Sequence, residues 1–179
     1  GLEDPNVVVS AEPSTSLEVC GDQQDRVLEV ARRFIDHYGP VGARLTVHAA
    51  LPRHVGLGSG TQLALAVAET LARTRGLKLS VKEMSRVTGR GGRSGVGTWV
   101  YWYGGLVVEG GHRAKGDGAL PPLLVHRPLP EHWRFVVACP HGRQGPSGAE
   151  EDEALFRIPP VPVAVVERIC RIVLLGLLP

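Results

Sequence analysis

Residues 56–72, "GLGSGTQLALAVAETLA", place three glycines directly before an apolar run. Residues 63–72 are apolar on nearly every side, which predicts a buried helix. Glycines before a helix let backbone N–H groups converge on one point without Cβ clashes, and the helix adds its unpaired donors and partial positive charge. The stretch therefore predicts a phosphate-binding loop, with a tight turn that binds nothing as the alternative.

Polar side chains in this loop extend the prediction. Ser59 and Thr61 offer hydroxyl donors, and Ser59 could also be a hydroxyl ligand to a Mg²⁺ ion that the phosphates attract. Two familiar motifs are excluded, since the P-loop ends in Gly-Lys-Ser/Thr and the dinucleotide fingerprint needs a third glycine three places after the second. The predicted binding residues of the loop are Gly56, Gly58, Ser59, Gly60, Thr61 and Gln62.

A second glycine cluster, "GRGGRSGVGTWVYWYGGLVVEGGHR", covers residues 89–113. An arginine on a flexible backbone can bind phosphate or carboxylate through two parallel hydrogen bonds from its guanidinium group. We therefore predict that Arg90, Gly92 and Ser94 belong to the anion site. Arg90 and Arg93 are both candidates for orienting a substrate carboxylate or for holding a phosphate group. An RNA-binding tract is disfavoured, because one glycine-arginine copy is followed by a hydrophobic aromatic segment.

Glu109 and His112 flank the pair Gly110 and Gly111. Neighbouring glycines let such side chains approach a substrate closely, so both are candidates for moving a proton or stabilising positive charge. With Arg93 they form the predicted catalytic set. A hairpin turn with solvated polar residues is the alternative.

Periodicity and turn residues predict the remaining elements. Strands are predicted at residues 6–10, 44–51, 99–103, 106–109 and 133–139, and helices at 23–38, 63–72, 80–89 and from 159 onward. The helix at 80–89 has a capping box, Ser80 with Glu83, and Gly89 as its stop. Because helices and strands do not alternate regularly, the predicted fold class is α+β.

Composition excludes several classes of protein. Of the 179 residues, 20 are Lys or Arg and 18 are Asp or Glu, so the net charge of +2 gives no reason to expect nucleic acid or membrane partners. The three cysteines, Cys20, Cys139 and Cys170, are far apart, which favours the reducing cytoplasm. The most apolar tract, 161–179, is interrupted by charges and predicts no membrane span.

The segment "LPRHVGLGSGTQLALAVA", residues 51–68, resembles the second signature of the GHMP superfamily of small-molecule kinases, and "SGVG" before "YGG" resembles another of its stretches. Gly97 stands where many of these kinases carry the aspartate that acts on the substrate hydroxyl. Without a side chain there, that route of phosphoryl transfer is lost. Together the two clusters resemble one branch of the superfamily, the β-ribofuranosylaminobenzene 5′-phosphate synthases.

This resemblance implies a GHMP-type N-terminal domain at 1–158, the first helix of a second domain at 159–179, and truncation at both ends. It implies an Mg²⁺-assisted reaction of 5-phosphoribosyl 1-pyrophosphate with 4-aminobenzoate or 4-hydroxybenzoate, releasing carbon dioxide and pyrophosphate in methanopterin biosynthesis. A homodimer is compatible with the sequence, but nothing specifies one. An ATP-dependent GHMP kinase and a non-catalytic phosphate-binding module remain as alternatives.

Overall fold

The protein is described by a computed structural model at residues 4–53, 55–92, 94–112, 118–138 and 149–177. The chain divides into two compact units, Gly1–Arg134 and Phe135–Pro179. The domain boundary predicted after residue 158 lies within the second unit, and it stays a prediction. Helices and strands are mixed as expected for the predicted α+β class.

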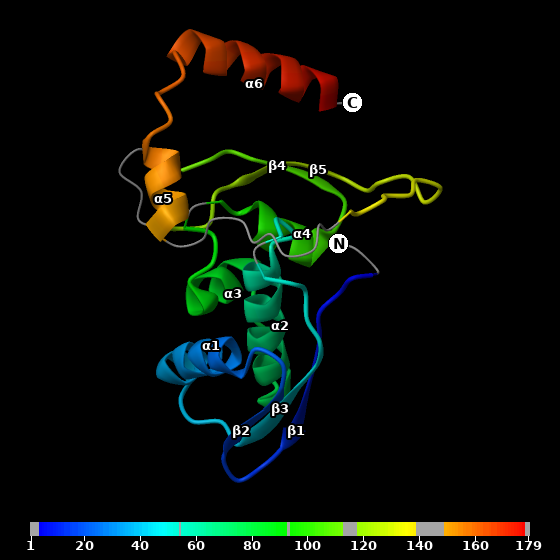
Figure 1. Cartoon of the computed structure of the whole chain (residues 1–179), viewed down its shortest axis with the longest axis vertical. Helices are drawn as coiled ribbons and strands as arrows, with labels where there is room; N and C mark the ends of the chain where they lie inside the picture. The colour runs from blue at the N-terminus through cyan, green and yellow to red at the C-terminus, as the bar shows by residue number, and fades with distance from the viewer. Residues whose placement is uncertain (1–3, 54, 93, 113–117, 139–148, 178–179) are drawn as a thin grey trace. The chain divides into compact units, whose positions relative to one another are not determined.

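A three-stranded sheet in the order β1, β3, β2 belongs to the first unit (Figure 1). It contains β1 (Val8–Pro13), β2 (Leu17–Gly21) and β3 (Ala43–Ala49), with β1 antiparallel and β2 parallel to β3. Buried and more exposed side chains alternate along β3, as a strand with one face on the core requires. The strand predicted at 44–51 is confirmed as β3, and the one predicted at 6–10 is confirmed only for residues 8–10, since β1 continues to Pro13. The strand β2 has no counterpart among the predicted elements.

Two long helices provide most of the core beside the sheet. The helix α1 (Gln24–Tyr38) and the helix α2 (Ser59–Thr74) contact each other, and α2 also contacts β1, β3, α3 and α4. Both confirm predicted helices, but α2 begins four residues before the predicted start at 63, so residues 59–62 of the predicted loop form its first turn. Their apolar stripes meet the inner face of the sheet, which removes that surface from water. The largest fully buried side chains include Val27, Phe34, Leu45, Leu63, Leu65, Val67, Leu71, Met84 and Val87.

The short helix α3 (Val81–Thr88) has the predicted capping box. The Glu83 amide donates to the Ser80 hydroxyl oxygen at 3.3 Å, and the Ser80 amide donates to the Glu83 carboxylate at 2.7 Å. These bonds satisfy donors that the helix leaves unpaired. Gly89 ends the helix with a φ of 63°, a left-handed conformation that suits glycine.

The strand predicted at 99–103 is wrong, because these residues belong to the helix α4 (Val96–Tyr103). Trp99 and Tyr103 are four residues apart, and their rings stack with centroids 6.1 Å apart. The Trp99 indole N–H also donates to the Pro121 carbonyl oxygen at 2.9 Å. Aromatic residues are common in strands, but packing on neighbouring elements decides their conformation.

A two-stranded antiparallel sheet follows, made of β4 (Leu106–Glu109) and β5 (Leu123–Arg127). The strand β4 confirms its prediction, and β5 has no predicted counterpart. The strand predicted at 133–139 is wrong for residues 133–138, which are exposed and pair with no strand in the described chain. Cys139 lies outside the described residues.

The second unit contains α5 (Ala149–Phe156) and α6 (Val163–Leu177), and α6 confirms the helix predicted beyond residue 159. None of the side chains of α6 is buried. Its exposed apolar side chains include Val163, Val165, Val166, Ile169, Ile172, Val173 and Leu175.

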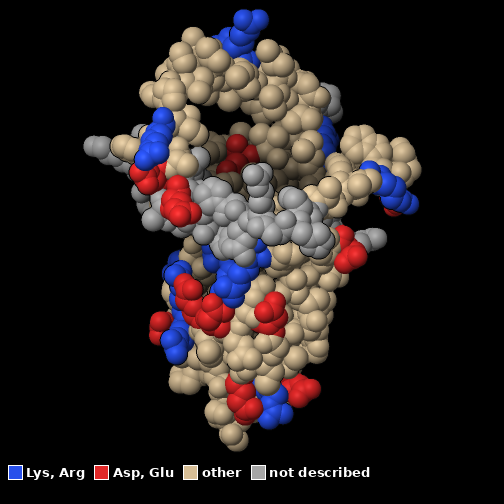
Figure 2. All heavy atoms as spheres, viewed as in Figure 1, with Lys and Arg blue, Asp and Glu red and all other residues tan. Residues whose placement is uncertain are grey.

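Charged side chains are interspersed on the face that Figure 2 shows. Acidic and basic groups lie beside each other at the lower end of this view. One ion pair, between Glu18 and Arg44 at 2.9 Å, joins β2 to β3. Over the described residues, no helix combines the length and apolar character needed to cross a membrane. Cys20 and Cys170 are free and exposed.

Candidate functional site

The N-terminus of α2 is formed by the predicted glycine loop. Gly58 is the N-cap residue with a φ of 68°, and Gly56 has a φ of 78°, so both occupy the left-handed region that glycine adopts without steric cost. No side chain caps the helix and no acidic residue lies in its first turn. A helix start of this kind leaves its first amide N–H groups available to an anion.

The amide N–H groups of Thr61 and Gln62 donate hydrogen bonds to the Gly58 carbonyl oxygen, at 3.0 and 3.1 Å. The amides of Ser59 and Gly60 have no such backbone partner in the described chain. Within the described residues, these two N–H groups are therefore donors without a hydrogen-bond partner at the N-terminus of α2.

Two arginine side chains approach this mouth from other elements. A Cβ atom built on Gly60 would lie 2.5 Å from Arg26 Nη2, and 3.6 and 3.7 Å from Arg90 Nη1 and Nη2. The sequence predicts Arg90 at the site, whereas it gives no sign of Arg26, which lies in the first turn of α1, 34 positions before Gly60. Only the fold brings the two together.

Arg90 is held at this place by the end of α3. Its amide donates to the Ser85 carbonyl oxygen at 3.0 Å, and its own carbonyl oxygen accepts a bond from the Ser85 hydroxyl. Ser85 is buried. The backbone of Arg90 is thus fixed, and its side chain extends toward α2.

The two glycine clusters meet between α2 and α4. The Gln62 side chain donates from Nε2 to the Gly97 carbonyl oxygen at 3.1 Å. A Cβ atom built on Gly97 would lie only 3.2 Å from Thr61 Cγ2, which is closer than ordinary van der Waals contact. Thr61 and Gln62 therefore hold α4 against the first turn of α2.

Glu109, a predicted catalytic residue, closes the start of α4. Its carboxylate accepts a bond from the Ser94 hydroxyl at 3.0 Å and from the Gly95 amide at 2.5 Å. Both carboxylate oxygens accept hydrogen bonds from the loop that leads into α4. The negative charge of Glu109 also interacts favourably with the positive end of the α4 helix dipole. Ser94, predicted to bind an anion, here donates to a carboxylate.

No hydrogen bond between His112 and the first turn of α2 occurs within the described residues. The His112 Nε2 atom is buried and has no hydrogen-bond partner within the described residues. Gly92 is exposed, and nothing lies within 4 Å of a Cβ built on it. Arg93, the third predicted catalytic residue, lies outside the described residues.

A partly buried polar contact that the sequence analysis missed joins α2 to α4. The Tyr101 hydroxyl donates to the Glu69 carboxylate, whose other oxygen pairs with Arg73. Burial raises the pKa of Tyr101, and the bond to Glu69 raises it further. Because α4 carries Gly97 at its opposite end, this contact helps to set the position of α4 on α2.

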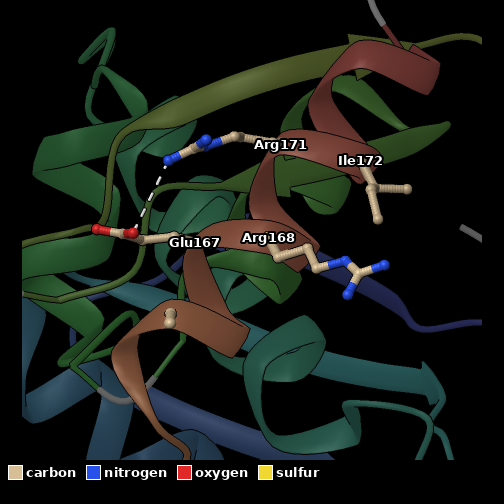
Figure 3. A pocket seen from close by; sticks show the side chains of 5 residues that line it. Glu167, Arg168, Arg171 and Ile172 are labelled. Atoms are coloured by element: carbon tan, nitrogen blue, oxygen red, sulfur yellow. Dashed lines mark ion pairs between the residues drawn. The ribbon is translucent and has the colours of Figure 1, made fainter.

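A shallow hollow on α6 is lined by Ala164, Glu167, Arg168, Arg171 and Ile172. In Figure 3, Glu167 and Arg171 point toward each other and form an ion pair of 3.8 Å, while Arg168 and Ile172 project elsewhere. All five belong to one helix, and none is a predicted site residue. The N-terminus of α2 is therefore the better candidate for a functional site.

A family model described as "GHMP kinases N terminal domain" matches residues 25–100. This range contains α1 from its second residue, β3, the glycine loop, α2, α3 and the start of α4. It therefore includes every group described at the mouth of α2.

Curated relatives match nearly the whole chain. The beta-ribofuranosylphenol 5'-phosphate synthase of Methanothermobacter thermautotrophicus is 33% identical over 199 aligned positions, and that of Archaeoglobus fulgidus is 34% identical over 188. Each alignment covers 99% of this chain and 60% of the relative. The chain thus spans less than two thirds of the length of these relatives.

Among solved structures, a 4-(cytidine 5'-diphospho)-2C-methyl-D-erythritol kinase shows a weak likeness, with a TM-score of 0.43 and 19% identity over 65% of this chain and 41% of that one.

Proposed function

Because the chain is a homologue of the beta-ribofuranosylphenol 5'-phosphate synthases and contains a GHMP kinases N terminal domain, we propose that it serves the corresponding synthase reaction. In that reaction, 5-phosphoribosyl 1-pyrophosphate combines with a benzoate, and carbon dioxide and pyrophosphate leave. The name of the relatives specifies a phenol, which favours 4-hydroxybenzoate over 4-aminobenzoate as the acceptor.

The observation that carries the proposal is the pairing of Gly97 with Thr61. The start of α2 leaves amide N–H groups available to an anion. Position 97, however, has no carboxylate that could act on a hydroxyl, and the Thr61 methyl group lies against it. A site of this kind can bind a diphosphate without activating an alcohol for phosphorylation. This arrangement supports a reaction in which diphosphate leaves rather than one in which phosphate is transferred.

The proposed mechanism depends on stabilising the negative charge that develops on the diphosphate as it leaves. As the bond between ribose C1 and the diphosphate oxygen breaks, its electron pair goes to the leaving group, and the ribose acquires oxocarbenium character. We propose that the Ser59 and Gly60 amides and the Arg90 guanidinium, which lie near one another, stabilise the growing negative charge. The ring carbon that carries the carboxylate then forms the carbon–carbon bond, and loss of carbon dioxide returns the electron pair to the ring.

Mg²⁺ is proposed to accompany the diphosphate. No group of three or more His, Cys, Asp or Glu that could hold a metal occurs within the described residues. The Ser59 hydroxyl is a single neutral oxygen at the mouth of α2, so it fits an ion bound mainly by phosphate and water. Such an ion would add positive charge to the leaving group.

The remaining predicted residues keep narrower roles in this proposal. Glu109 shapes the loop before α4 through Ser94 and Gly95. Arg93 is proposed to orient the carboxylate of the aromatic acid, and His112 to move a proton, as their residue types allow.

The test is product analysis of the protein with 5-phosphoribosyl 1-pyrophosphate, Mg²⁺ and either benzoate labelled in its carboxyl carbon. We expect labelled carbon dioxide and pyrophosphate in equal amounts, with 4-hydroxybenzoate used faster than 4-aminobenzoate. ATP-dependent phosphorylation of an alcohol without release of carbon dioxide would identify a kinase instead. Binding of 5-phosphoribosyl 1-pyrophosphate without turnover would identify a binding module.

A further inference from the structure

The Arg26 side chain lies beside Gly60, one of the predicted anion-binding residues. It comes from α1, yet its Nη2 atom would lie 2.5 Å from a Cβ on Gly60, closer than either terminal nitrogen of Arg90. Two guanidinium groups therefore approach one short stretch of helix backbone from different elements.

No carboxylate offsets the charge of Arg26 within the described residues. Its side chain donates from Nη1 to the neutral Gln23 amide oxygen at 2.8 Å. The adjacent Asp25 is paired instead with Arg53, at 2.9 Å. This pairing lowers the pKa of Asp25, mainly through the bond from Arg53. The nearest acid along the chain is thus used elsewhere.

Gln23 fixes the direction of the Arg26 side chain. Its Oε1 accepts the bond from Arg26, and its Nε2 donates to the Leu51 carbonyl oxygen at 3.2 Å. Gln23 is 8% exposed and has a φ of 55°, and within the described chain it is the one residue other than glycine with a positive φ. A buried side chain bonded at both ends, on a strained backbone, is well suited to holding a neighbouring group in one orientation.

We propose that Arg26 is a further binding residue of the α2 site, contacting the diphosphate of the substrate, and that Gln23 is its positioning residue. This assignment rests on the function proposed above. The Arg26 guanidinium and the Ser59 and Gly60 amides lie at one short stretch of backbone, and a diphosphate has enough oxygens to accept hydrogen bonds from all of them. The chemical class of ligand is therefore a diphosphate ester.

The test compares the affinity of variants of the 179-residue chain for inorganic pyrophosphate with Mg²⁺, measured by isothermal titration calorimetry. Arg26→Gln is expected to weaken binding about tenfold, since a charge-assisted contact is lost. Arg32→Gln is the matched control, because Arg32 is an exposed residue of α1 and the substitution removes the same charge. It should change the affinity less than about twofold.

Gln23→Asn tests the positioning role. Asparagine tolerates a positive φ, so the backbone is kept, but the side chain is too short to bridge Arg26 and Leu51. We expect about threefold weaker binding, and no further loss when Gln23→Asn is added to Arg26→Gln. Additive losses in the double variant would show that Gln23 does not act through Arg26.

The outcomes separate this inference from the proposed function. If the unsubstituted chain binds pyrophosphate and Arg26→Gln binds it as tightly as Arg32→Gln, Arg26 is not part of the site and the proposed function survives. If the unsubstituted chain does not bind pyrophosphate, both fail. Should Arg26→Gln unfold, Arg26→Lys against Arg32→Lys decides, with weaker binding expected only for Arg26→Lys because the planar fork is lost.

Discussion

Thr61 lies against Gly97, so that a Cβ atom at position 97 would come within 3.2 Å of the Thr61 methyl carbon. The contact joins the first turn of α2 to the first turn of α4. The Gln62 bond to the Gly97 carbonyl oxygen reinforces it. The spacing between the two helices therefore depends on the absence of a side chain at position 97.

This packing predicts coupling between the two positions. At Gly97→Ala the alanine gains up to about 1 kcal/mol of helix preference in α4, but its methyl group forces Thr61 to move, so we expect no net rise in the free energy of unfolding. Thr61→Ser removes the methyl group, so in that background Gly97→Ala should cost about 0.5 kcal/mol less. Urea unfolding of the four proteins measures the coupling, and additive effects would show that the two residues do not touch.

Gly60→Ala should separate stability from binding. Alanine favours a helix over glycine by up to about 1 kcal/mol, so the free energy of unfolding should not fall. The new Cβ would displace Arg26 Nη2, so the affinity for pyrophosphate should fall several-fold. Gly176→Ala in α6 is the control, since its Cβ would meet no atom within 4 Å. Equal affinities for the two variants would contradict the described site.

Glu109→Gln should affect stability first. An amide cannot accept bonds from both Ser94 and Gly95 through two oxygens, so we expect a loss of about 1 kcal/mol in the free energy of unfolding. Glu29→Gln, which removes an exposed ion pair with Arg33, should cost less than about 0.5 kcal/mol. Unchanged stability together with a large loss of turnover would instead assign Glu109 a direct part in the reaction.

Tyr101→Phe should change the dependence of stability on high pH. The pKa of Tyr101 is raised in the folded protein by burial and by Glu69, so its contribution is complete below the unfolded pKa of about 10 and is lost as pH rises toward the folded value. We expect Tyr101→Phe to be less stable at pH 8 by about 1 kcal/mol, and this difference to shrink above pH 10. Urea unfolding at both pH values measures it, and a constant difference would show that Tyr101 does not titrate with unfolding.

Local patterns predicted what local chemistry determines. The helical spacing of Val27, Val30 and Phe34 predicted α1, and Ser80 with Glu83 predicted the start of α3. The alternation in residues 44–51 predicted β3. In each case the signal lies within one turn of helix or a few strand residues.

The remaining features depend on contacts between distant residues. Residues 99–103 are helical because Trp99 stacks on Tyr103 and bonds to Pro121, and β-forming side chains alone do not reveal that packing. Arg26 was not predicted as a site residue, because no residue in its own turn of α1 indicates that it lies beside Gly60 in the folded chain. Glu109 was recognised as a functional candidate from its glycine neighbours, whereas its bonds to Ser94 and Gly95 required the fold.

The central claim is that the free amides at the start of α2 bind the diphosphate. An amide-resolved NMR titration of the chain with Mg²⁺ and 5-phosphoribosyl 1-pyrophosphate tests it most directly. The account predicts that the amide signals of Ser59 and Gly60 shift the most and saturate together. Saturable binding that leaves these two signals in place while amides elsewhere respond would contradict it.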